Sequence, residues 1–160
     1  MAFAAYITGA PFIFPSLGPT AFLLFYTPMA HTACPRNTLA GHAIGAAAGY
    51  FALVVFGLQH AAPALTTGVT APRVGAAAIS LGLTSGLMVW AHVPHPPAGA
   101  TTLIVSLGIL HEPWQLAVLM LAVVMLALQG LTINRLAGIP VPLWGPAKDP
   151  SVRPNSNTDP

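Results

Sequence analysis

The sequence predicts an all-α protein that crosses a membrane several times, and three observations support this fold class. Of the 160 residues, 55% are hydrophobic and only 5% are charged, whereas roughly 25% of residues are charged in an average soluble domain. The few charged residues lie between long apolar stretches or near the C-terminus. Prolines and glycines interrupt two of these stretches, which predicts a helical bundle containing two broken half-helices.

Three apolar stretches are long enough to span the hydrocarbon core, which takes about 20 helical residues with roughly 17 as the lower limit. They run over residues 39–58, 74–90 and 114–131. We expect each of them to form a full transmembrane helix.

The remaining apolar stretches, residues 1–14, 17–25 and 98–110, are too short to cross alone. Prolines precede the second and third of these stretches, so the helix that starts at Val74 should break near His92 and a new helix should start at Pro97 or Ala98. We expect half-helices that reach from mid-membrane to one face. A cleaved signal peptide is the alternative for the first stretch, although it lacks a basic n-region.

The chain divides into a transmembrane domain over residues 1–137 and a proline-rich polar tail over residues 138–160, which we expect to be partly disordered. The net charge of +2 comes from a few loop residues, so nucleic acid is not an expected partner. No paired acids, Gly-rich phosphate loop or nucleophile with a base are recognisable, so we expect neither an enzyme nor a cofactor.

Glycines recur at four-residue spacing on two spans and predict close helix contacts, within the chain or in a homo-oligomer. The two stripes are Gly41, Gly45 and Gly49, and Gly82 and Gly86.

The two half-helices form an internal repeat. The segment Pro15–Leu24 aligns without a gap with Pro96–Val105, which matches proline, glycine and threonine and then an apolar run. Two full spans separate the copies, so the second half-helix should run opposite to the first. Secondary transporters commonly use inverted repeats of this kind and bind anions between paired helix N-termini.

Four blocks along the chain are similar to the HPP family of integral membrane proteins. They are Ser16-Leu17-Gly18-Pro19-Thr20-Ala21, Cys34-Pro35-Arg36-Asn37 with Gly41-His42, His95-Pro96-Pro97-Ala98-Gly99-Ala100-Thr101, and Asn134-Arg135 before Pro142 and Trp144. The resemblance implies a compact helical membrane domain, and cyanobacterial and plastid relatives are associated with nitrite transport.

We therefore expect a transporter of a small inorganic anion, nitrite by this resemblance, with the lipid bilayer as its surroundings. The alternative is a membrane sensor, scaffold or accessory subunit that transports nothing. The expected substrate-binding residues lie at the two helix starts: Ser16, Gly18, Pro19, Thr20, His95, Pro96, Pro97, Gly99, Ala100, Thr101 and Thr102.

Arg36, Asn37 and His42 are candidates for gating or proton coupling. His42 lies within a span, where an ionisable residue is costly and mostly functional. Arg36 lies at a span entrance, where it could gather anions or anchor the topology. Structural roles are the alternative for His42 and His95, and Arg73 is interpreted as a topology anchor. No metal site is expected, since the prolines around His92 and His95 break the helical face that would align them.

The basic residues Arg36, Arg135, Lys148 and Arg153 indicate that the start of the residue 39–58 span and the C-terminus both face the cytoplasm. The expected location is a cell membrane, as a multi-pass protein, with the bacterial inner membrane as the favoured one.

Overall fold

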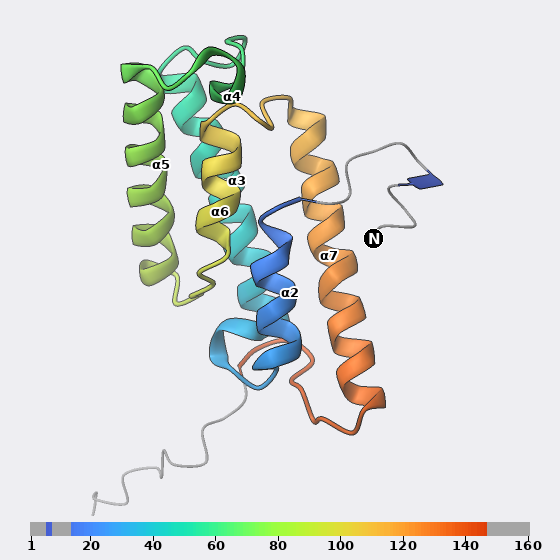
Figure 1. Ribbon diagram of the computed structural model, residues 1–160. Helices are drawn as coiled ribbons and strands as arrows, with labels where there is room; N and C mark the ends of the chain where they lie inside the picture. The colour runs from blue at the N-terminus through green and yellow to red at the C-terminus, as the bar shows by residue number, and fades with distance from the viewer. Residues whose placement is uncertain (1–5, 8–13, 147–160) are drawn as a thin grey trace, which may run out of the picture.

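A computed structural model describes residues 6–7 and 14–146, and these residues form helices and no strand. In chain order the elements are α2 (Leu17–Tyr26), the 3₁₀ helix η1 (His31–Ala33), α3 (Pro35–Val55), α4 (Ala64–Thr67), α5 (Ala71–Trp90), α6 (Ala98–Ser106) and α7 (Pro113–Leu136) (Figure 1). The predicted helical membrane bundle is confirmed.

The three predicted spans are present as α3, α5 and α7, which have 21, 20 and 24 residues and the apolar composition of membrane-crossing helices. They start four, three and one residues earlier than predicted, because proline at the first or second helical position fits the helix and needs no backbone partner. Cys34 is the N-cap of α3, and Asn37 and Thr38 lie within the first turns of the helix.

Both predicted half-helices are also present, with 10 residues in α2 and nine in α6. His92 adopts a positive φ of 53°, which marks the break after α5 at the predicted position. Helix α6 ends at Ser106 rather than at Leu110 because Gly108 turns the chain with a φ of 79°.

Helices α2 and α6 run in opposite directions from near the middle of the bundle, α2 downward and α6 upward in Figure 1. These are the directions that an inverted repeat requires. The symmetry relation between the two halves stays a prediction.

Helix α3 lies at the centre and packs most extensively on α6 and α5. Its glycine stripe is the reason for the close approach to α6: a Cβ atom added to Gly41 would lie 2.6 Å from the His95 Cβ, and one added to Gly45 would lie 2.7 Å from the Ala98 carbonyl oxygen. The stripe on α5 differs, since a Cβ atom added to Gly82 or Gly86 would have no neighbour within 4 Å among the described residues.

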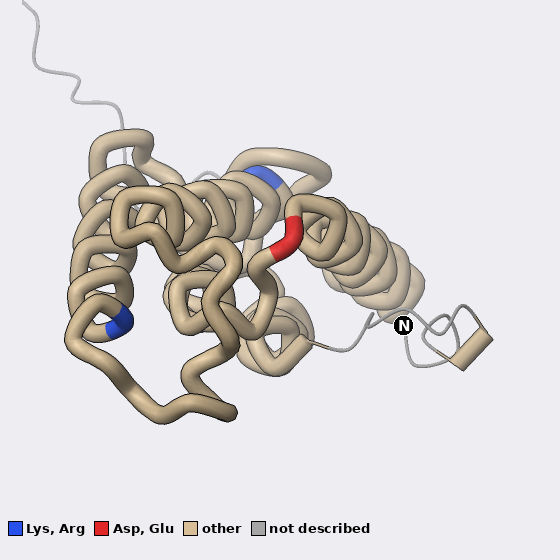
Figure 2. Tube along the Cα trace, turned by 90° about the horizontal axis from the view of Figure 1, so that it is seen from above, with Lys and Arg blue, Asp and Glu red and all other residues tan. Residues whose placement is uncertain are grey.

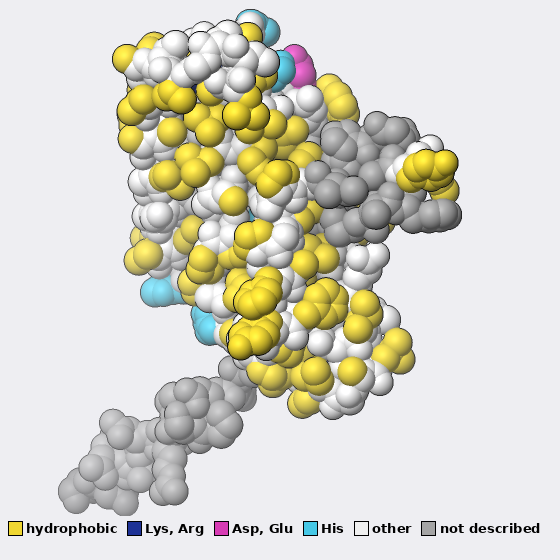
Figure 3. Space-filling view, viewed as in Figure 1, with side chains coloured by type: hydrophobic (Ala, Val, Ile, Leu, Met, Phe, Trp, Pro, Cys, Tyr) yellow, Lys and Arg dark blue, Asp and Glu magenta, His cyan; other side chains and the backbone are white. Residues whose placement is uncertain are grey.

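The bundle is apolar outside and partly polar inside, as expected for a protein surrounded by lipid. Hydrophobic side chains cover most of the face seen in Figure 3, and the histidines visible there lie mostly at its two ends. The tube in Figure 2 shows how few charged residues the described chain carries. They are Arg36, Arg73, Glu112 and Arg135.

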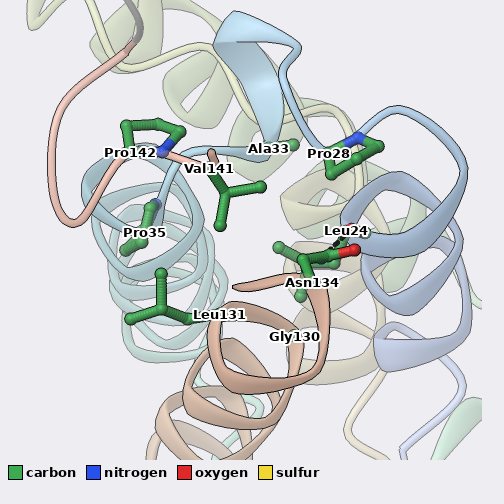
Figure 4. A pocket seen from close by; sticks show the side chains of 9 residues that line it. All are labelled: Leu24, Pro28, Ala33, Pro35, Gly130, Leu131, Asn134, Val141 and Pro142. Atoms are coloured by element: carbon green, nitrogen blue, oxygen red, sulfur yellow. Dashed lines mark hydrogen bonds between the residues drawn. The ribbon is translucent and has the colours of Figure 1, made fainter. Parts of the chain in front are cut away.

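The segment after α7 returns to the start of α3, where the Arg36 amide donates to the Trp144 carbonyl at 3.0 Å. Next to it lies a small hollow lined mainly by apolar side chains, with Asn134 donating to the Leu24 carbonyl at 2.8 Å (Figure 4). These contacts fix the end of α7 to α2 and α3. The apolar stretch of residues 1–14 and the polar tail lie largely outside the described residues.

Candidate functional site

One buried histidine joins the two half-helices. The Nε2 atom of His42, on α3, lies 2.8 Å from Thr20 Oγ1 on α2, and its Nδ1 atom lies 2.7 Å from Thr101 Oγ1 on α6. The two threonines occupy equivalent positions in the aligned repeat copies. The bundle therefore brings the repeat threonines to opposite edges of one imidazole ring.

A second histidine completes this cluster. His95, in the break before α6, places Nε2 3.3 Å from Nε2 of His42 and 3.3 Å from Thr20 Oγ1. Its Nδ1 atom lies 2.8 Å from the carbonyl oxygen of Thr32 in η1. We call Thr20, His42, His95 and Thr101 the histidine–threonine cluster.

All four side chains of the cluster are fully buried, with 0% relative exposure. Among the described residues, Ser16 Oγ and Thr38 Oγ1 are also buried and have no hydrogen-bond partner. Ser16 precedes Thr20 by one helical turn, and its carbonyl accepts the Thr20 hydroxyl at 3.2 Å. Thr38 precedes His42 by one turn on α3, so unused hydrogen-bonding groups flank the cluster.

The backbone amides at the two helix starts are already paired. Leu17 and Gly18 donate to the carbonyls of Phe14 and Pro15, and Ala98, Gly99 and Ala100 donate to those of His95, Pro96 and Pro97. These five amides are not available to an anion, because tight turns before each helix supply their acceptors. Donors for an anion must therefore come from side chains, although both helix dipoles still point their positive ends toward the cluster.

Several residues predicted for the site lie beside the cluster instead of in it. An open groove of about 430 Å³ between the half-helices is lined by Pro19, Phe22, Leu23, Pro96, Pro97 and Ala100. Gly18 is exposed, and a Cβ atom added to Gly99 would lie 3.8 Å from the Leu81 side chain. Thr102 turns away from His42 and lies 2.8 Å from Thr84 Oγ1 on α5.

Arg36 and Asn37, the predicted gating residues, hold loops at the start of α3. The Arg36 guanidinium donates to the His92 carbonyl at 2.9 Å, and the Asn37 amide donates to the His31 carbonyl at 2.9 Å. Neither has a hydrogen bond to the cluster. His42, placed with them in the prediction, is instead the centre of the cluster.

The sequence analysis missed the polar face of α5. The buried residues of this helix are Arg73, Ala76, Ser80 and Thr84, which share one helical face. Arg73 was interpreted as a topology anchor, and the structure gives it a further role: it is 2% exposed and donates to the carbonyls of Ser106, Ala61 and Ala62. The spacing of Arg73, Ser80 and Thr84 along α5 was the signal that could have predicted this buried face.

Within the described part of the chain, no three histidine, cysteine or acidic side chains gather as metal ligands would. The only acid there, Glu112, caps α7 and contacts His111 at 3.5 Å. The chemistry of the cluster is therefore that of hydroxyl and imidazole groups.

These features define a class: a polytopic helical membrane protein with two half-helices that meet at a buried polar centre. The chain belongs to the HPP family, since the family model that describes the HPP transmembrane region matches residues 1–142. Searches of curated proteins and of solved structures found no match.

Proposed function

We propose that this protein transports a small monovalent anion, nitrite by family resemblance, and binds it at the histidine–threonine cluster. The observation that carries the proposal is the position of His42, which bonds the equivalent threonines of two opposed half-helices. A substrate held there contacts both halves of the bundle.

The cluster has the chemistry for a weakly held anion. Threonine hydroxyls and an imidazole N–H donate hydrogen bonds, and two helix dipoles add a favourable potential. Neither histidine ring has a hydrogen bond to an arginine, lysine or acid in the described residues. A site without a fixed opposite charge releases its ligand readily, as transport requires.

In the occluded state, the anion replaces the bonds of His42 to Thr20 and Thr101 and uses Ser16 and Thr38 as further hydroxyl partners. Access from the two sides then requires the half-helices to move relative to α3. The glycine stripe of α3, packed closely on α6, provides a smooth surface for such a movement.

The test is nitrite uptake into liposomes containing the purified protein. Thr20→Val and Thr101→Val remove one hydroxyl each and should reduce uptake at least about tenfold, which corresponds to roughly 1.4 kcal/mol. Thr67→Val is the matched control, because Thr67 also donates to the carbonyl four residues earlier, at 3.2 Å, but is exposed. Absence of flux for nitrite and other small anions would favour the sensor or scaffold alternative.

A further inference from the structure

The two histidines of the cluster face each other through their Nε2 atoms. His42 Nε2 and His95 Nε2 are 3.3 Å apart, and the ring centroids are 4.9 Å apart. A hydrogen bond between two imidazole nitrogens needs one N–H and one lone pair.

The hydrogen-bond partners decide which nitrogen carries each proton. The Thr32 carbonyl can only accept, so His95 carries its proton on Nδ1 and presents a lone pair on Nε2. His42 then carries its proton on Nε2, because both groups facing that nitrogen present lone pairs: His95 Nε2 at 3.3 Å, and Thr20 Oγ1 at 2.8 Å, whose own proton goes to the Ser16 carbonyl. The Nε2–H of His42 is shared between these two acceptors. The remaining lone pair, on His42 Nδ1, accepts the hydroxyl of Thr101.

This arrangement accepts one further proton without a new clash. The proton binds Nδ1 of His42, the Thr101 hydroxyl rotates to accept from it, and the Nε2–H of His42 still donates to His95. If that Nε2 proton moves to His95, its bond to His42 breaks as its bond to His95 forms, and His42 remains neutral with its proton on Nδ1. In each state one hydrogen lies between the two Nε2 atoms.

A second proton is excluded by geometry and by charge. It would put an N–H on both Nε2 atoms, which face each other at 3.3 Å, and two positive charges side by side in a buried site repel strongly. Among the described residues, the groups bonded to the rings carry no charge: they are Thr20 from α2, Thr101 from α6 and the Thr32 carbonyl from η1. The nearest arginine along the chain, Arg36, bonds the His92 carbonyl and has no hydrogen bond to either ring.

We propose that His42 and His95 act as one acceptor for a single proton, so that the protein moves one proton with each monovalent anion and the transport step is electroneutral. This inference deepens the proposed function and rests on it for the transport step. The shared proton itself has a readout that needs no transport.

The first experiment measures the shared hydrogen directly, by nitrogen-15 NMR of histidine-labelled protein in bilayers across a pH titration. We expect a nitrogen–nitrogen coupling across the His42–His95 hydrogen bond, which persists as the pair takes up one proton and disappears in His95→Gln. His60→Gln, at an exposed loop histidine, should preserve it. Independent uptake of a proton by each ring, or no coupling at any pH, would overturn the shared-proton proposal.

The second experiment measures nitrite and proton entry together in proteoliposomes containing an internal pH dye, with the flux of protein-free liposomes subtracted. The expected ratio is one proton per nitrite, with a rate that an imposed membrane potential does not change. Nitrite uptake that depends on potential or carries no proton overturns the coupling but leaves the proposed function standing. If the nitrogen–nitrogen coupling is seen by NMR but no anion flux is found, the transport function is refuted, and the proton-coupled transport step with it.

Discussion

Nδ1 of His42 lies 2.7 Å from Oγ1 of Thr101, although 59 positions separate the two residues in the chain. With the Thr20 contact at the opposite edge of the ring, this bond ties both half-helices to the central helix α3. The His-Pro-Pro break before α6 therefore sets the position of Thr101 as well as that of His95.

Replacing Thr101 by valine should impair both folding and transport. The valine keeps the size of the side chain but leaves His42 Nδ1 buried without a partner, which costs about 1–3 kcal/mol. Thermal unfolding in detergent should show the loss of stability. Thr101→Ser keeps the hydroxyl and should restore most of the stability and uptake, and equal behaviour of the two variants would contradict the role of the hydroxyl.

Gly45→Ala should separate α3 from α6. The added Cβ atom would lie 2.7 Å from the Ala98 carbonyl oxygen and 2.9 Å from Thr102 Oγ1, so α6 must shift. We expect destabilisation of about 1–3 kcal/mol, as for other overpacked sites. Gly82→Ala is the control, because nothing lies within 4 Å there; if both variants unfold at the same temperature, the close contact is not needed.

Arg73 should stabilise the fold at the C-terminal end of α6. Its guanidinium donates to the carbonyls of Ser106, Ala61 and Ala62, and Arg73→Gln leaves several of these acceptors unpaired. Hydrogen bonds to charged groups contribute about 1.5–3 kcal/mol, so the melting temperature should fall clearly. Gly108→Ala should have a similar effect, since its Cβ atom would lie 2.6 Å from the guanidinium. If both variants are as stable as the parent protein, Arg73 acts as a topology anchor only.

Nitrite uptake should increase as the pH on the substrate side falls. Acid favours the singly protonated His42–His95 pair, which is the form that carries the anion in our proposal. The measurement is the initial rate over a series of external pH values, corrected for protein-free liposomes. His42→Gln removes the ring that takes up the proton and should abolish this dependence, whereas an unchanged pH profile would refute its origin in the pair.

The sequence predicted the positions of the helices more accurately than the side-chain contacts between them. Helix length and apolar composition were sufficient for α3, α5 and α7, and prolines marked the breaks that define α2 and α6, because both signals are local. The buried positions of Arg73 and Thr84 were missed, since hydropathy does not reveal which face of an apolar helix meets a neighbour. For the same reason His42 was expected to act in gating or proton coupling, separately from Thr20 and Thr101, although all three lie in one cluster.

The central claim is that the histidine–threonine cluster binds the transported anion. The most direct measurement compares the concentration dependence of nitrite uptake for the parent protein, His42→Gln and His60→Gln at equal amounts of folded protein. We predict saturable uptake that His42→Gln reduces at least tenfold, about 1.4 kcal/mol, and that His60→Gln leaves unchanged. Saturable uptake of equal rate in all three proteins would contradict the claim.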